Sequence, residues 1–278
     1  MRLASYRHRG NASYGIVVQD GIIDLAGRTG ARSLRELLER QLVAGCGRYA
    51  GLAADVPLAQ IEWLPPVPDA DRIMCAGINY RSHAAETGRD LPANPSMFLR
   101  HRASLVGHGQ PVRKPRASDH YDYEGELALV IGRAGRHIAL ADALDHVAGY
   151  TCLNDGSVRD YQKISVGNGK NFEASGACGP WMVTVDEIPD PARLALETRL
   201  NGQVVQHSGT DLLIYSIPHI ISYYSTICTL MPGDIITTGT PDGVGSQRKP
   251  PLWMRAGDRI EVEISAIGTL ANPVLDEG

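Results

Sequence analysis

Asp122-Tyr123-Glu124-Gly125-Glu126-Leu127-Ala128-Leu129-Val130-Ile131-Gly132 is the stretch that decides the fold. Residues 127–131 are uninterrupted apolar sequence rich in branched side chains, which is typical of a buried strand that ends at Gly132. Because side chains alternate along a strand, we expect Glu124 and Glu126 on one face, with their Cα atoms roughly 6–7 Å apart. Both carboxylates can then reach a single ion.

These two carboxylates leave two interpretations open. Unpaired negative charges at the mouth of a buried strand repel each other and lose hydration unless a cation lies between them, which favours a hard divalent metal. Charged residues are mostly exposed, however, so a solvated sheet edge is the alternative. Gly125 points to the opposite face, where the lack of a side chain allows another segment to approach closely.

The composition is that of a globular enzyme rather than a nucleic-acid-binding or membrane protein. With 43% hydrophobic and 21% charged residues and a net charge of -4, the chain lacks a basic excess. Many glycines and prolines and only two phenylalanines favour a loop-rich β architecture. The five cysteines have no zinc-binding spacing, which fits reduced thiols and predicts a cytoplasmic protein. No signal-like apolar segment and no run of eighteen apolar residues occurs, so we expect neither standard export nor a membrane span.

Two domains are predicted, with a boundary near residue 67. Strand-like runs at 2–6, 14–18 and 21–25 form a β meander, and residues 33–43 have helical spacing with Ser33 as N-cap. Several prolines between residues 57 and 68 then interrupt the pattern. We therefore predict a small N-terminal domain, residues 1–66, and a catalytic domain, residues 67–278.

A third carboxylate, Asp155, follows the strand-like run 147–153. If residues 156–162 are helical, Asp155, Arg159 and Gln162 lie along one helix face. An acid, a guanidinium and an amide in one line suit a binding site. The alternative is an N-cap at Asp155 with an ion pair to Arg159 four residues later.

Three further positions carry candidate chemistry. His83 and Glu86 are neighbours on a short helix, and a carboxylate beside an imidazole can make it a general base, although a surface ion pair has the same spacing. Lys170 lies in a glycine-rich loop, where a solvated lysine is the ordinary interpretation. Thr240 follows a strand in a Gly/Pro/Thr loop whose amides and hydroxyl can bind an anionic oxygen, but the loop lacks the lysine of a P-loop.

The C-terminal third contains a second Glu-x-Glu stretch. Residues 196–206 are typical of a hairpin around an Asn-Gly turn, and residues 217–230 have helical spacing. Glu261 and Glu263 alternate regularly with apolar neighbours, so we interpret them as a solvated face. We interpret the remaining notable histidines as surface or structural residues: His101, His108 and His219.

Taken in order, six short motifs resemble the fumarylacetoacetate hydrolase superfamily over roughly residues 70–265. Each motif alone is weak, but their order is specific. They are Gly77-x-Asn79-Tyr80-x-x-His83-x-x-Glu86, Tyr123-Glu124-x-Glu126, Asn154-Asp155-x-x-x-Arg159-Asp160-x-Gln162, Gly169-Lys170-x-Phe172, Gly179-Pro180-Trp181 and Gly239-Thr240-Pro241-x-Gly243-Val244-Gly245.

The resemblance implies an α+β, predominantly β fold: a mixed β-roll or sandwich with a small β-rich N-terminal domain, usually assembled as a homodimer. It also implies one Mg²⁺ or Mn²⁺ per chain, which suits oxygen ligands, and assigns each candidate residue a role. The implied metal ligands are Glu124, Glu126 and Asp155; the catalytic residues are His83, Glu86 and Lys170; the substrate-binding residues are Arg159, Gln162, Thr240 and Arg100. The chain departs from the family at Arg100, where lysine is frequent, and at Gly125, where valine is common.

The resemblance predicts a hydrolase that cleaves a C–C bond in an acylpyruvate-like β-diketo acid through a stabilised enolate, in aromatic or sugar-acid catabolism. Decarboxylation, hydration or tautomerisation of a 2-oxo acid of the oxaloacetate or 2-oxo-enoate type passes through the same enolate and is the alternative. A non-catalytic protein that binds a metal and a 2-oxo acid is less favoured, because His83, Glu86 and Lys170 are all present.

Overall fold

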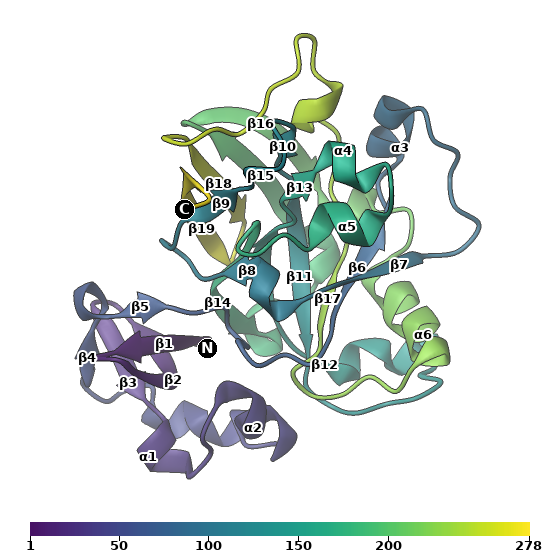
Figure 1. Cartoon of the computed structure of the whole chain (residues 1–278). Helices are drawn as coiled ribbons and strands as arrows, with labels where there is room; N and C mark the ends of the chain where they lie inside the picture. The colour runs from purple at the N-terminus through teal and green to yellow at the C-terminus, as the bar shows by residue number, and fades with distance from the viewer.

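The computed structural model describes residues 1–278 and contains sheets of twelve, five and two strands. In the large sheet the strand order is β4-β3-β2-β1-β14-β12-β11-β17-β6-β7, with β5 added to β1 and β8 to β14. The five-stranded sheet has the order β16-β15-β18-β19-β9, and β10 pairs with β13 (Figure 1). The strands are β1(Arg2–His8), β2(Asn11–Val18), β3(Gly21–Asp24), β4(Val56–Pro57), β5(Glu62–Trp63), β6(Ile73–Gly77), β7(Ser96–Arg100), β8(Leu105–Val106), β9(Val112–Lys114), β10(Tyr121–Asp122), β11(Gly125–Ile131), β12(Val147–Asn154), β13(Ser157–Val158), β14(Gly176–Thr184), β15(Ala195–Leu200), β16(Gln203–Gly209), β17(Ile235–Thr237), β18(Arg259–Ile264) and β19(Gly268–Asp276).

The predicted buried strand is β11, which lies inside the large sheet between β12 and β17. Every residue of β11 is buried, because both faces of the sheet are covered. Its odd-numbered apolar residues belong to a core shared with the five-stranded sheet, and its even-numbered ones belong to a core shared with the N-terminal segment. The alternation therefore puts Glu126 on the face opposite Gly125.

The N-terminal segment shares a sheet and a core with the rest of the chain. Strand β1 pairs antiparallel with β14, with Leu3 opposite Met182. The buried leucines of α2 belong to the same apolar cluster as Ala128 and Val130 of β11. Figure 1 shows the N-terminal elements at one end of the molecule, away from α3 and α4. The division at residue 67 remains a prediction.

Six α-helices complete the fold, and they are short: α1(Ala26–Thr29), α2(Leu34–Glu39), α3(Arg81–Thr87), α4(Arg159–Gln162), α5(Val166–Lys170) and α6(Ile217–Ile227). Ser33 caps α2 as predicted, because its side chain accepts the Glu36 N–H at 3.2 Å. The predicted helix over 156–162 is wrong in its first half. Ser157 and Val158 instead pair with Asp122 and Tyr121, so the helix starts only at Arg159.

Strands outweigh helices, in mixed parallel and antiparallel sheets, and this confirms the predicted α+β, predominantly β fold class. The Asn-Gly hairpin is also confirmed: Asn201 and Gly202 have positive φ angles between β15 and β16. No helix in the structure combines the length and the apolar character that a membrane span requires. The large sheet and the five-stranded sheet thus pack as two layers around a shared core, with α4 and α5 beside the short strand β13 that follows β12 (Figure 1).

Candidate active site

Three buried carboxylates meet where β11 begins and β12 ends. These strands pair antiparallel with Gly125 opposite Asn154, so Glu124 and Glu126 lie beside Asp155. The Asp155 N–H donates to the Glu124 carbonyl oxygen at 2.8 Å, which holds the residue before β11 beside the residue after β12. One oxygen from each carboxylate lies within 4.8 Å of the others. The structure therefore brings together the three residues that the sequence proposed as metal ligands.

Two cations neutralise Glu124. Lys170, only 1% exposed, donates from Nζ to Glu124 Oε2 at 2.6 Å and to Asp155 Oδ2 at 2.5 Å. Arg159 Nη1 contacts Glu124 Oε1 at 2.7 Å. Burial alone would raise the pKa of Glu124, but the charges of Lys170 and Arg159 outweigh it and hold that pKa below its ordinary value. Burial would likewise lower the pKa of Lys170, and the neighbouring Asp155 and Glu124 raise it instead. Lys170 is thus a buried ammonium ion, not a solvated loop lysine.

Glu126 is the least compensated member of the triad. Its Oε2 accepts one hydrogen bond, from the Gly239 N–H at 3.0 Å. Burial, followed by the negative charges of Asp155 and Glu124, raises the pKa of Glu126 well above its ordinary value. A buried carboxylate is destabilised when no cation is paired with it. A cation bound between Glu126 and the other two carboxylates would therefore stabilise the ionised form of Glu126.

Arg100 lies beneath the triad rather than on the cavity wall. Its side chain has no exposed area, and Nη1 forms an ion pair with Asp155. The other donors go to the Gly156 carbonyl, to both oxygens of Ser104 and to Ser175 Oγ. All five N–H groups of a guanidinium are directed at protein acceptors in this way. The structure does not place Arg100 where a substrate would contact it, and its partners give it a role in fixing Asp155.

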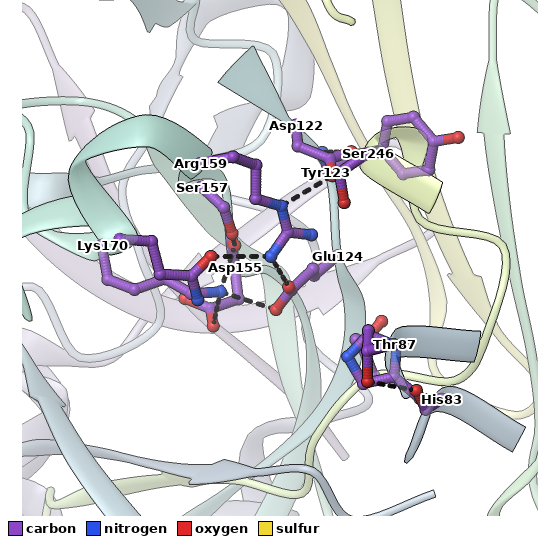
Figure 2. Close-up of polar contacts among 12 residues, drawn as sticks. His83, Thr87, Asp122, Tyr123, Glu124, Asp155, Ser157, Arg159, Lys170 and Ser246 are labelled. Carbon is purple, nitrogen blue, oxygen red and sulfur yellow. Dashed lines mark hydrogen bonds and ion pairs between the residues drawn. The ribbon is translucent and has the colours of Figure 1, made fainter. Parts of the chain in front are cut away.

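Asp122 is a site residue that the sequence did not single out. Its fully buried carboxylate accepts the Arg159 Nε–H at 2.7 Å and the N–H groups of Gly245 and Ser246 at 2.8 and 2.9 Å. Figure 2 shows Arg159 between Asp122 and Glu124. Asp122 therefore ties the loop after residue 243 to the arginine that holds Glu124. The only signal for it was a carboxylate two residues before Glu124.

The donor set fits a hard divalent cation. Four buried carboxylates face three largely buried cations: Asp122, Glu124, Glu126 and Asp155 against Arg100, Arg159 and Lys170. If all four carboxylates are ionised, one negative charge is left without a cation, and it falls to Glu126, which pairs with none of the three. Oxygen ligands without thiol or imidazole suit Mg²⁺ or Mn²⁺. Glu124, Glu126 and Asp155 would hold the ion.

His83 lies on α3, across Glu124 from Lys170 in Figure 2. Its Nδ1 is 3.3 Å from Glu86 Oε2, and Glu86 Oε1 accepts the Gly243 N–H at 2.8 Å. A carboxylate at Nδ1 favours the tautomer that carries its proton there and leaves Nε2 as the basic nitrogen. The imidazole is mostly buried but belongs to the cavity wall. The predicted pair of His83 and Glu86 is present, and the hydrogen bond from the Gly243 N–H holds the Glu86 carboxylate in place.

A cavity of about 730 Å³ joins these groups. His83, Glu124, Glu126 and Lys170 line it, together with Arg159, Gln162 and Thr240 among the predicted substrate residues. Gln162 Oε1 accepts from Arg159 Nη1 at 2.9 Å. The rest of the wall combines apolar, cationic and acidic side chains, including Met97, Phe98, Trp253, Arg89, Lys163, Asp90 and Asp160. A small anion can therefore be enclosed between the triad and α3.

Comparison with known proteins assigns this arrangement to a family. Residues 72–275 match the model of the fumarylacetoacetate (FAA) hydrolase C-terminal domain. The chain belongs to the fumarylacetoacetate hydrolase family. The sequence is 38% identical to the Xenopus laevis protein named oxaloacetate tautomerase fahd2, mitochondrial, covering 99% of this chain and 90% of that one. It is 42% identical to oxaloacetate tautomerase YisK of Bacillus subtilis (strain 168), over 78% of this chain and 74% of that one.

Solved structures of this family agree in fold. A putative HpcE protein from Mycobacterium smegmatis superposes with a TM-score of 0.87 at 32% identity, with full coverage of both chains. Maleylpyruvate hydrolase from Sphingobium sp. SYK-6, crystallised with manganese(II) ion and pyruvate, gives 0.84 at 33% identity, again over both whole chains. The relatives are enzymes, so this chain is an enzyme of the family, and its buried acidic triad is compatible with a divalent metal. This disfavours the non-catalytic alternative.

Proposed function

We propose that the chain is a Mg²⁺- or Mn²⁺-dependent tautomerase of oxaloacetate or a closely similar 2-oxo dicarboxylic acid. The observation that carries the proposal is one cavity with an oriented imidazole, His83, facing an acidic triad suited to a metal. The names of the relatives support the reaction type, since several are oxaloacetate tautomerases. This favours the alternative of the sequence analysis over its first choice, the C–C hydrolase.

The proposed mechanism needs one base. When bound, the divalent cation would act as a Lewis acid that makes the hydrogens beside the 2-oxo group more acidic. His83 Nε2 takes a proton from C3, the electron pair of that C–H bond forms the C2–C3 double bond of the enol, and the π pair of the C2–O double bond moves onto the 2-oxo oxygen. The resulting imidazolium ion returns the proton to the 2-oxo oxygen, and Glu86 stabilises the charge meanwhile. Lys170 and Arg159 hold Glu124 in place throughout.

Two exposed cations in the cavity wall suit a dicarboxylic substrate. Arg89 and Lys163 line the cavity together with the carboxylates Asp90 and Asp160, and neither cation forms an ion pair with a residue of the chain. Free cations at this position can accept the carboxylate that lies farther from the metal. Uncharged acyl groups would leave both without a partner.

The test measures interconversion of the enol and keto forms of oxaloacetate by ultraviolet absorbance, with Mg²⁺, with Mn²⁺ and after chelation. We expect chelation to abolish catalysis and His83→Ala to lower kcat by about 10²- to 10⁴-fold. His219→Ala is the matched control, because His219 is exposed on α6 and packs on Tyr215 outside the cavity. An unchanged rate in His83→Ala, or no acceleration by the wild-type protein, would contradict the proposal.

Hydrolysis of an acylpyruvate is the second candidate, and the similarity to maleylpyruvate hydrolase, solved with manganese(II) ion and pyruvate, supports it. In that reaction His83 would deprotonate a water molecule that attacks the distal carbonyl, and C–C cleavage would release pyruvate. Pyruvate formation from a panel of acylpyruvates distinguishes the two reactions. A kcat/KM for any acylpyruvate above that for oxaloacetate would make the hydrolase the better assignment.

The expected homodimer and cytoplasmic location are proposals as well. Light scattering during size-exclusion chromatography tests the first, and a single-chain mass would contradict it. Fractionation of the source cells tests the second. Neither proposal affects the chemistry of His83 and the triad.

A further inference from the structure

Gly125, the residue between two metal-ligand candidates, is where the second sheet touches the active site. A Cβ atom at this position would overlap Thr198 Oγ1 of β15 and come within 3.4 Å of Gln206 Oε1 of β16. The absence of a side chain at Gly125 therefore admits two polar side chains of the five-stranded sheet. This confirms the close approach expected from the sequence.

Gln206 uses this opening to bridge two parts of the site. Its side-chain oxygen accepts the Gly125 N–H at 2.9 Å, and its Nε2 donates to Thr240 Oγ1 at 2.8 Å and to the Pro241 carbonyl at 3.0 Å. The residue is 2% exposed. A buried primary amide with one acceptor bond and two donor bonds is well satisfied and holds its partners in one geometry.

The bridge determines what Thr240 can offer to a ligand. The Thr240 hydroxyl donates its hydrogen to the Gly125 carbonyl at 3.0 Å and accepts from Gln206, so it has no proton left for an anion. The preceding N–H, of Gly239, goes to Glu126. The N–H of Thr240 has no acceptor within the chain. Because Thr240 lines the cavity, its N–H is the uncommitted donor at this corner.

We propose that Gln206 is a positioning residue of this active site. Its amide fixes the Thr240 hydroxyl against Gly125, so that Thr240 presents its backbone N–H, and not its hydroxyl, to a ligand carboxylate. This rests on the proposed function only in taking a carboxylate as the ligand. It reassigns the predicted contact of Thr240 and adds a residue from the second sheet that no motif contains.

The experiment measures binding of oxalate, an unreactive dicarboxylate, to Mn²⁺-loaded protein by calorimetry. We expect Gln206→Leu and Thr240→Val each to raise Kd by about three- to tenfold, the value of one net hydrogen bond. The double variant should be no weaker than either single one, because both substitutions break the same bridge. Gln206→Glu, which keeps the acceptor and loses the donor, should weaken binding at least as much. Thr198→Val is the control, because Thr198 Oγ1 has no hydrogen-bond partner, and its Kd should match the wild type.

Two results would overturn the inference: a loss of a hundredfold or more in Thr240→Val with an unchanged Kd in Gln206→Leu, or additive effects in the double variant. Thermal unfolding of the metal-free proteins gives a readout independent of ligand. Gln206→Leu, Thr240→Val and their double variant should again show non-additive shifts in Tm, and additivity would contradict the bridge. A wild-type protein that binds oxalate without converting oxaloacetate would refute the tautomerase and leave this test intact. Failure of the loaded wild type to bind oxalate would overturn both.

Discussion

The chain contains two Glu-x-Glu stretches, and their environments differ completely. In Glu124-Gly125-Glu126 the glutamate side chains are nearly inaccessible and share a cluster with Asp155. In Glu261-Val262-Glu263 the glutamate side chains are 19% and 46% exposed. Those two lie on either side of Arg199, which also pairs with Glu197. One stretch is a candidate metal centre, and the other is part of a surface ion-pair network.

The covering of each strand's faces explains the difference, since both strands have a neighbouring strand on each side. Strand β11 has a core on each face, so carboxylates at its start are removed from water. Strand β18 turns only Ile260, Val262 and Ile264 to the core, and the residues between them face outward. The same Glu-x-Glu pattern is therefore buried where both faces of the sheet are covered and exposed where only one face is covered.

Neutralising one glutamate in each stretch is the largest expected contrast. Glu126→Gln removes a charged ligand from the triad. We expect metal-dependent turnover of oxaloacetate to fall at least about a hundredfold, because even residues that only hydrogen-bond to metal ligands typically cost about 10- to 100-fold in activity when mutated. Glu263→Gln should leave kcat/KM unchanged within twofold. Steady-state kinetics with saturating Mn²⁺ measures both. Full turnover in Glu126→Gln would remove the distinction between the stretches.

The arginine beside each cluster gives the second contrast. Arg100→Met removes one of the two cations that pair with the buried Asp155 and leaves only Lys170, and breaking a buried ion pair typically costs about 3–5 kcal/mol of unfolding free energy. Arg199→Met breaks pairs at the surface and should cost only about 0–1 kcal/mol. Urea unfolding of the metal-free proteins measures both values. Equal costs would show that burial does not separate the two networks.

The central residue of each stretch gives the smallest contrast. Gly125→Ala should destabilise the protein by about 1–3 kcal/mol through overlap with Thr198. Adding Thr198→Ala, which deletes the overlapping oxygen, should recover part of this loss. Val262→Ala serves as the control. It creates a cavity and no overlap, so adding Thr198→Ala to it should recover no stability. A Gly125→Ala protein as stable as the wild type would contradict the close approach of β15.

Local patterns predicted those parts of the molecule that depend on neighbours in sequence. The buried strand predicted at 127–131, the Asn-Gly hairpin and the Ser33 cap all follow from short-range rules. The triad required Asp155 to meet Glu124 through strand pairing, and the ordered motifs of the family supplied that information.

Long-range partners account for what the sequence could not show. Pairing of Ser157–Val158 with Tyr121–Asp122 displaced the start of the predicted helix to Arg159. Arg100 was expected at the substrate because nothing local indicates that its guanidinium reaches Asp155, 55 positions away. Gln206 is 81 positions from Gly125, in a strand whose sequence gives no sign of the active site.

Counting the Mn²⁺ bound per chain tests the central claim most directly. Electron paramagnetic resonance of free Mn²⁺ during titration gives the number of sites for the wild type, Glu126→Gln and Glu263→Gln. We predict one tight site in the wild type and in Glu263→Gln, and none in Glu126→Gln. A tight site that survives in Glu126→Gln, or that disappears in Glu263→Gln, would contradict the assignment of the metal to Glu124, Glu126 and Asp155.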